Sequence, residues 1–250
     1  MENIKVNSIL LFFLGLLLFS NCADVELEEN PPSTVDLKTF FTTDSEFQAS
    51  LAGTFLSLYQ GCEGFDYAYP LILTSGGEDV MSTAGIFLNL NRLSANDGDQ
   101  SIEAVWRRFY KAIANANLII GNLENAQEVP EDRLNAIEGQ AKFVRAFCFF
   151  YLVRWFGEIQ LTTIDHIADV DNLRQASVAE IYASIIENLK DAETKLPVSF
   201  PDEKGRPTQG AAKALLAKVY LTMAGWPLED ASYYALARDK AAEVMALGYD

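Results

Sequence analysis

The sequence contains few of the residues on which most catalytic and metal sites depend. Among 250 residues there is one histidine, His166, and there are three cysteines. Any mechanism that pairs a serine or cysteine nucleophile with a histidine base would have to use His166, which we expect to be a solvated loop residue. A zinc site built from several histidine and cysteine ligands is excluded. Phosphate-binding and dinucleotide-binding fingerprints are also missing, so we predict neither an enzyme nor a bound cofactor.

Carboxylates leave two chemistries open. Asp165, Asp169 and Asp171 could hold a hard cation, but their spacing is not that of an EF-hand loop. Neighbouring acids such as Glu78 and Asp79 could hydrolyse a glycoside only at a suitable separation. Such pairs are inevitable among 35 acidic residues, so we predict no metal site and no catalytic pair.

Basic residues, glycine and proline are scarce. The 19 lysines and arginines are outnumbered by 35 acidic residues, which gives a net charge of −16. Nucleic-acid binding needs clustered Lys and Arg and is therefore not expected. The 15 glycines and 8 prolines together make up about 9% of the chain, below the average usage of roughly 12%. This scarcity favours helices over turn-rich architectures. Half of the residues are hydrophobic, so the chain can bury a core.

The amino-terminal segment predicts export. The stretch from Ile9 to Phe19 is almost entirely Leu, Ile and Phe, but it is shorter than the roughly 20 residues that span a bilayer. It is typical of a signal peptide, predicted over residues 1–21. The following Cys22 resembles the modified cysteine of bacterial lipoproteins, which would become the new amino terminus and carry the lipid. A plain secretory peptide with an incidental cysteine is the alternative.

An acidic tether follows, predicted over residues 22–43. Its sequence ADVELEENPPS has four carboxylates before two prolines and cannot fold alone. It resembles the acidic export signal of surface lipoproteins of the Bacteroidetes type, although an ordinary charged linker would have the same composition. The two remaining cysteines, Cys62 and Cys148, do not indicate a disulfide framework, and Cys148 reads as a small buried hydrophobe.

The rest of the chain, residues 44–250, is predicted to be all-α. Apolar residues recur at helical spacing in six stretches, and no alternation demands a sheet. The expected helices span residues 44–59, 101–123, 130–156, 177–196, 208–224 and 230–247. Leu216, Ala217 and Tyr220 fit part of the tetratricopeptide pattern. The order of helices therefore predicts stacked helix pairs with long irregular loops.

Local signals refine three of these helices. Ser101 is a predicted N-cap, and Ser177 with Glu180 forms a predicted capping box. Gly157 is the expected left-handed stop after Phe156. The helix over residues 130–156 is apolar on two sides and should lie between neighbours, so Arg145 within it requires a carboxylate or carbonyl partner.

Four ordered blocks carry a family resemblance. They are WRRFYKAIANANLII, AKFVRAFCFFYLVRWFG, VAEIYASIIENLKDAETKLP and GRPTQGAAKALLAKVYLTMAGWP. Their order and spacing resemble the SusD/RagB nutrient-uptake lipoproteins of Bacteroidetes outer membranes. Because members of that family are commonly much longer, the chain resembles their amino-terminal half or a truncated relative.

The resemblance implies a function without catalysis. A protein of this family would be lipid-anchored to the outer membrane and would face the cell exterior. It would capture a nutrient, expected to be an oligosaccharide, and deliver it to a TonB-dependent transporter of the SusC-like type. Two alternatives stay open. The ligand could be a peptide, or the helix pairs could form a tetratricopeptide scaffold that binds a protein segment.

The long connection over residues 61–100 is the predicted ligand platform. Aromatic faces cover the apolar side of a sugar ring, while amides, carboxylates and arginine satisfy its hydroxyls. Trp226, in the last loop between helices, is a further candidate. The complete set is Tyr67, Tyr69, Phe87, Asn89, Asn91, Arg92, Asn96, Asp97 and Trp226. The alternative is that these aromatics only pin the loop to the helices.

Other polar and aromatic residues are expected to have structural roles. Asn115 and Asn117 should make hydrogen bonds between helices. Trp106 and Trp155 should belong to the core or to contacts between helices.

Overall fold

The computed structural model describes residues 40–59, 88–92, 94, 96, 98–163 and 173–249, all within one compact unit, Thr39–Asp250. Its elements, in chain order, are α2 (Asp44–Tyr59), α4 (Leu88–Asn91), α5 (Gln100–Gly121), the short 3₁₀ helix η2 (Leu123–Asn125), α6 (Glu131–Phe156), β1 (Ile159–Gln160), β2 (Gln175–Ala176), α7 (Val178–Lys195), α8 (Gln209–Ala224) and α9 (Tyr233–Met245). The all-α prediction is confirmed, because strand in these ranges is limited to the two-residue pair β1 and β2.

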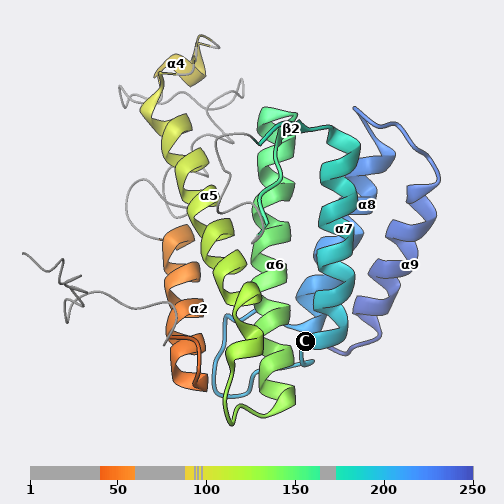
Figure 1. Ribbon diagram of the computed structural model, residues 1–250. Helices are drawn as coiled ribbons and strands as arrows, with labels where there is room; N and C mark the ends of the chain where they lie inside the picture. The colour runs from red at the N-terminus through yellow and green to blue at the C-terminus, as the bar shows by residue number, and fades with distance from the viewer. Residues whose placement is uncertain are drawn as a thin grey trace, which may run out of the picture. The chain divides into compact units, whose positions relative to one another are not determined.

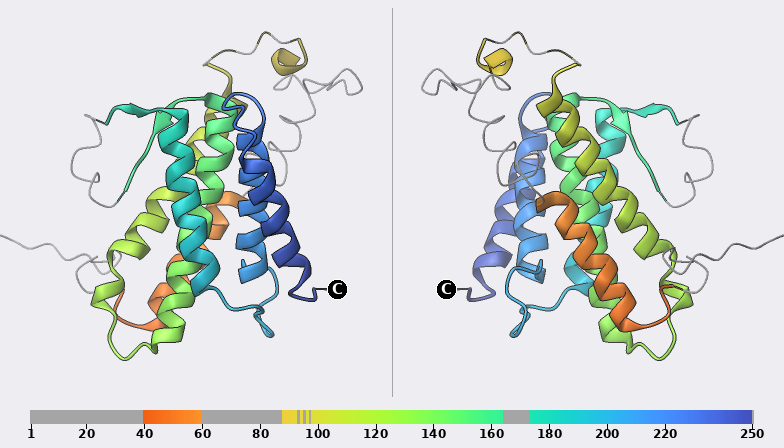
Figure 2. Two further views of the ribbon diagram at one scale, coloured as in Figure 1. Left: turned by 90° about the vertical axis from the view of Figure 1, so that its right-hand side faces the viewer. Right: turned by 90° about the vertical axis from the view of Figure 1, so that its left-hand side faces the viewer.

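The long helices stack in chain order. From α5 to α9, each helix packs on the next, and α2 packs on α5 and α6. Successive helices run in opposite directions, so α5 and α7 descend in the view of Figure 1 while α6 and α8 ascend. This arrangement confirms the predicted stacked helix pairs. It also places alternate loops at opposite ends of the stack, as both views of Figure 2 show.

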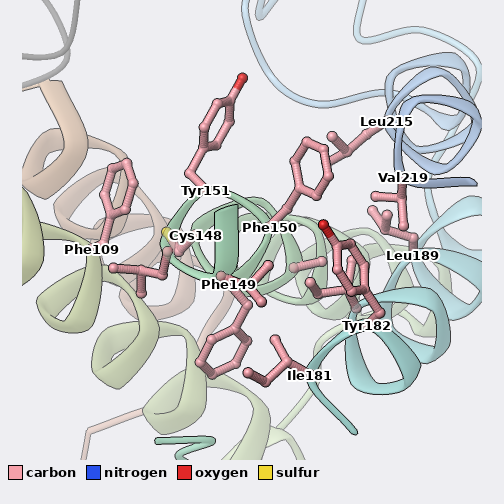
Figure 3. Close-up of a cluster of buried hydrophobic side chains, with 14 of the residues drawn as sticks. Phe109, Cys148, Phe149, Phe150, Tyr151, Ile181, Tyr182, Leu189, Leu215 and Val219 are labelled. Atoms are coloured by element: carbon pink, nitrogen blue, oxygen red, sulfur yellow. The ribbon is translucent and has the colours of Figure 1, made fainter. Parts of the chain in front are cut away.

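Helix α6 is the centre of the main core. Its buried side chains lie on more than one side, as the two predicted apolar stripes require. In Figure 3, Phe109 of α5 lies beside Cys148, while Phe150 points toward Tyr182 of α7 and Leu215 of α8. The rings of Phe150 and Tyr182 meet edge to face with centroids 6.4 Å apart. Burying each such side chain stabilises the fold by about 1.5–3 kcal/mol.

A second buried cluster attaches α2 to α5 and α6. It consists of Phe41, Phe47, Leu51, Ala116, Ile119, Ile137 and Ala141. At the beginning of α2, the Glu46 carboxylate accepts hydrogen bonds from the backbone N–H groups of Thr42 and Thr43, both at 2.9 Å. These bonds lower the pKa of Glu46 to about 2. An ion pair of 2.9 Å between Arg133 and Asp44 further joins α6 to α2.

The capping box of α7 is confirmed. The Ser177 hydroxyl accepts a hydrogen bond from the Glu180 backbone N–H, and the Glu180 carboxylate accepts one from the Ser177 backbone N–H. Gly157 ends α6 with a φ of 74°, as a glycine stop requires, although its ψ of −124° lies outside the left-handed helical region.

Several helix boundaries differ from prediction by one to three residues, among them the starts of α5 and α9. Ser101 is not the N-cap of α5, because the helix begins at Gln100 and Asp99 occupies the capping position. The last helix begins at Tyr233 rather than near Asp230. The Asp230 carboxylate instead accepts hydrogen bonds from the backbone and hydroxyl of Ser232. Asp230 therefore belongs to the turn before α9 and not to the helix itself.

The β1–β2 pair joins the two ends of a connection. Ile159 pairs with Ala176 and Gln160 with Gln175 in antiparallel register, and the Gln160 side chain also donates to the Leu173 carbonyl. Residues 164–172 between them, which include His166, lie outside the described residues. Within the described ranges, no helix combines the length and the apolar character needed to cross a membrane.

Candidate functional site

The predicted site residues fall into two groups. Asn89, Asn91, Arg92 and Asn96 belong to the α4 segment, and Trp226 belongs to the α8–α9 loop. The other predicted residues lie outside the described residues: Cys22, Tyr67, Tyr69, Phe87 and Asp97. Figures 1 and 2 show the α4 segment and the α8–α9 loop at the same end of the helix stack.

The α4 segment is organised around Asp99. The Asp99 carboxylate accepts hydrogen bonds from the Asn89 side-chain amide at 3.0 Å and from the Asn96 backbone N–H at 2.9 Å. The Asn96 bond is the larger cause of the lowered pKa of Asp99. The Asn96 side-chain oxygen also accepts the Gly98 N–H at 2.8 Å. Asn89 and Asn96 therefore shape the turn that leads into α5.

Other members of this segment differ in exposure. Arg92 is exposed at the end of α4, and Asn91 is half-buried. The guanidinium of Arg92 is thus accessible to a ligand, whereas the amide groups of Asn89 and Asn96 are partly occupied by the turn. The prediction that all of these side chains contact a ligand stays untested.

Trp226 offers a flat and accessible aromatic surface. Its side chain is 81% exposed in the loop after α8. The same loop borders a hollow of about 640 Å³ between α7 and the α8–α9 pair, to which Leu228 and Tyr233 contribute. An exposed indole can cover the apolar face of a sugar ring. Trp226 is more exposed than Tyr59 and Tyr234, the next most accessible aromatic residues of the described part.

Trp106 and Trp155 lie in helix contacts, as predicted. The Trp106 ring meets Phe156 edge to face with centroids 4.9 Å apart. Trp155 stacks on Phe109 with centroids 6.1 Å apart and planes 15° from parallel. Both tryptophans pack against the main core rather than projecting from the stack.

The sequence did not predict a larger hollow, which lies between α6 and α7. It has a volume of about 810 Å³ and is bordered by Leu161 and Thr162, which follow β1. Its lining includes Lys142 and Arg145 of α6 and Ser184, Asn188 and Lys190 of α7. We call it the α6–α7 groove. The only signal in the sequence was Arg145, a charged residue among apolar neighbours.

Arg145 is held by two asparagines. One terminal nitrogen donates to the Asn117 side-chain oxygen at 2.8 Å, and the other donates to the Asn188 side-chain oxygen at 2.5 Å. Asn117 in turn donates to the Thr162 carbonyl at 3.0 Å, and Asn188 donates to the Ser184 carbonyl at 2.7 Å. Asn117 therefore connects helices as predicted, and the oxygen partners of Arg145 are side-chain amides.

Lysines beside Arg145 are neutralised by carboxylates. Lys142 pairs with Glu138 at 2.7 Å and also with Asp191. Lys195 pairs with the same two carboxylates, at 2.6 and 3.1 Å. The lysines lower the pKa of both carboxyls despite the opposing effect of burial. This network joins α6 to α7 along one side of the groove.

The described residues contain little that could support metal chemistry. No group of three or more His, Cys, Asp or Glu side chains converges within them. Cys148 is fully buried, and burial raises the pKa of its thiol. Since the thiolate is the reactive form, Cys148 is a poor nucleophile.

A comparison with protein families identifies the chain. Residues 27–221 match the SusD-like family that is described as starch-binding and associating with the outer membrane. The chain belongs to the SusD-like family. It is 31% identical over 216 residues to SusD-like protein P2 of Formosa agariphila. The matched region covers 84% of this chain and 42% of that relative. The sequence therefore spans less than half the length of this SusD-like relative.

Solved SusD-like structures share the fold. A SusD homolog from Bacteroides thetaiotaomicron superposes with a TM-score of 0.74 at 23% identity, covering 85% of this chain and 42% of that one. A laminarin-binding SusD-like protein gives a TM-score of 0.65 at 25% identity, covering 82% and 43%. A structure solved with a xylogluco-oligosaccharide gives 0.66 at 28% identity, covering 80% and 41%. These likenesses confirm the predicted helical, tetratricopeptide-like architecture.

Proposed function

We propose that this chain is a lipid-anchored outer-membrane protein that faces the cell exterior and binds an oligosaccharide. It delivers that ligand to a TonB-dependent transporter of the SusC-like type and performs no chemical step. The family match over residues 27–221 is the observation that carries the proposal. One structural relative is a laminarin-binding SusD-like protein, and another was solved with a xylogluco-oligosaccharide. Both support a glycan as the ligand.

Loops at one end of the stack are the proposed ligand platform. Arg92 directly follows α4 and Trp226 belongs to the α8–α9 loop, and both residues are exposed. These two segments lie at the same end of the stack (Figure 1). An indole face and a guanidinium are complementary to the apolar and hydroxyl-bearing sides of a sugar. We include Tyr67, Tyr69, Phe87 and Asp97 in this platform on the basis of the sequence.

Calorimetric titration with oligosaccharides tests the proposal. The chain from residue 22 onward would be titrated with laminarin- and xyloglucan-derived oligosaccharides. We expect Trp226→Ala to weaken the affinity roughly 2- to 10-fold, because a lost aromatic contact is worth about 0.5–1.5 kcal/mol. Leu221→Ala is the matched control, since Leu221 is a 55% exposed apolar residue on the adjacent α8. Absence of binding to every oligosaccharide would contradict the capture of a glycan.

Anchoring and delivery need separate tests in bacterial cells. Metabolic labelling with a radioactive fatty acid should mark the protein, and Cys22→Ala should abolish the label. Affinity purification from outer membranes should recover a large β-barrel transporter. Recovery of soluble proteins alone would instead favour the tetratricopeptide scaffold, and binding of peptides without glycans would favour peptide uptake.

A further inference from the structure

Arg145 is a half-buried cation without a carboxylate partner among the described residues. Its three hydrogen bonds all go to the neutral oxygens of Asn117 and Asn188. Burial lowers the pKa of Arg145 and is the largest influence on it. The negative charges of Glu187 and Glu138 raise that pKa, although neither carboxylate forms an ion pair with Arg145. Removing a guanidinium from water is costly, and neutral amides offset that cost only in part.

The charges around Arg145 do not cancel. Lys142 and Lys195 are balanced by Glu138 and Asp191 in the network described above. The groove lining then retains Arg145 and Lys190 against one carboxylate, Glu187. Lys190 is exposed and forms no ion pair with a described residue. Among the described residues, the groove lining and its ion-pair network therefore have a surplus of one positive charge, on a chain whose net charge is −16.

The remaining lining suits a sugar. Thr162, Ser184 and Thr194 place hydroxyl groups at the groove, and Phe149 and Leu161 add apolar surface. Its volume of about 810 Å³ lies within the 300–1,000 Å³ that is common for small-molecule sites. A guanidinium presents parallel N–H groups that match a carboxylate, and two of the five N–H groups of Arg145 are not used by the three bonds described above.

We propose that the α6–α7 groove binds a uronate unit of an acidic oligosaccharide, with the sugar carboxylate directed toward Arg145 and Lys190. This inference rests on the proposed glycan-binding function and specifies a substrate class for a second site, separate from the loop platform. One carboxylate neutralises the surplus charge, and hydroxyl groups of the same sugar bond to Ser184 and Thr162.

A matched pair of ligands tests the inference. The chain from residue 22 onward, which retains the whole compact unit, would be titrated with oligogalacturonate and with its methyl ester, in which the carboxylates are neutral. We expect the ester to bind roughly tenfold or more weakly, because it loses charge-assisted hydrogen bonds. The affinity for the free acid should fall with added salt.

Variants locate the site. We expect Lys190→Glu to weaken acid binding roughly 3- to 10-fold, while Lys204→Glu, the same charge change at an exposed turn outside the groove, leaves it unchanged. Arg145→Lys should also weaken it, with circular dichroism and unfolding midpoints confirming that the variant folds. Because Lys190 is exposed, its variant keeps the test valid even if Arg145→Lys is unstable.

The outcomes separate this inference from the proposed function. Equal affinity for acid and ester, or acid binding that Lys190→Glu leaves unchanged, would overturn the groove site. Binding of laminarin or xyloglucan oligosaccharides without acidic ones would overturn the groove site alone and leave glycan capture intact. Failure of neutral and acidic oligosaccharides alike would overturn both.

Discussion

At the scale of single residues, two carboxylates at helix beginnings tie stability to pH. Hydrogen bonds lower the pKa of Glu46 and of Glu180 to about 2, against an ordinary 4.5. For Glu180 the largest cause is the Arg174 side chain, followed by the Ser177 backbone. A carboxyl whose pKa is lowered on folding stabilises the protein above its unfolded pKa and loses that contribution as pH falls toward the folded value.

The first prediction follows from the loss of this stabilisation as the pH falls. We expect the free energy of unfolding to fall between pH 4.5 and 2, and Glu180→Gln to reduce it at pH 7 while flattening its decline in acid. Urea unfolding at a series of pH values measures both effects. Glu158→Gln is the control, because Glu158 is exposed and makes no bond with a described residue. Parallel pH profiles for the wild type and Glu180→Gln would contradict the assignment.

A second prediction concerns the contact between Gly210 and Tyr249. The Tyr249 hydroxyl accepts the Gly210 N–H at 3.2 Å and donates to the Val198 carbonyl at 2.6 Å. A Cβ on Gly210 would lie 2.1 Å from the Tyr249 ring. Gly210→Ala should therefore displace the ring and lower the free energy of unfolding by about 1 kcal/mol, the usual worth of such a hydrogen bond.

Two controls isolate that contact. Gly53 is exposed in α2 and would gain a Cβ in open space, so Gly53→Ala should stabilise by about 0.5–1 kcal/mol. In a Tyr249→Ala background, Gly210→Ala should no longer cost stability. A cost that persists in this double-mutant cycle would place its origin elsewhere than Tyr249.

At the scale of elements, α6 carries the fold because it contacts neighbours on several sides. Phe150 is fully buried where α6 meets α7 and α8. Phe150→Ala should lower the free energy of unfolding by about 3–5 kcal/mol, through lost transfer energy and the cavity that remains. Leu221→Ala on the exposed side of α8 should change it by less than about 0.5 kcal/mol. Chemical denaturation measures both, and similar costs would contradict the central position of α6.

The sequence was most informative about elements with local signals. Helix α2 has the predicted bounds because its apolar spacing is regular, and α7 begins as predicted because Ser177 and Glu180 complete each other's hydrogen bonds. Prediction failed at Ser101 because Asp99 is buried and takes the capping position while its carboxylate bonds to the α4 segment. These partners precede the helix, so no pattern within the helix reveals the contact.

The α6–α7 groove was invisible to sequence reasoning for the same reason. The apolar neighbours of Arg145 predicted that it has an oxygen partner but not which residue supplies it. Its partners Asn117 and Asn188 are 28 and 43 residues away along the chain. Only helix packing brings the three side chains together. Trp226, in contrast, was chosen from the sequence because it lies in the last loop between helices, and its 81% exposure agrees with that position. Its contact with a ligand stays a prediction.

At the scale of the whole molecule, the helix stack separates a buried aromatic core from exposed residues on its connections. Buried aromatics such as Phe109 and Phe150 hold the helices together, while Arg92 after α4 and Trp226 in the α8–α9 loop are exposed. We propose that the helix stack positions the connections and that residues on those connections bind the neutral oligosaccharide. The chain covers 42% of its SusD-like relative from Formosa agariphila.

Nuclear magnetic resonance of the three tryptophan indoles tests the central claim most directly. Trp226 is exposed, whereas Trp106 and Trp155 pack against the core, so one titration with laminarin or xyloglucan oligosaccharides compares the loop platform with the helix stack. Single Trp→Phe variants assign the three N–H signals. We predict that the Trp226 signal shifts on saturation while the other two stay in place. Shifts confined to Trp106 or Trp155, or no shift with any oligosaccharide, would contradict ligand binding at the loop platform.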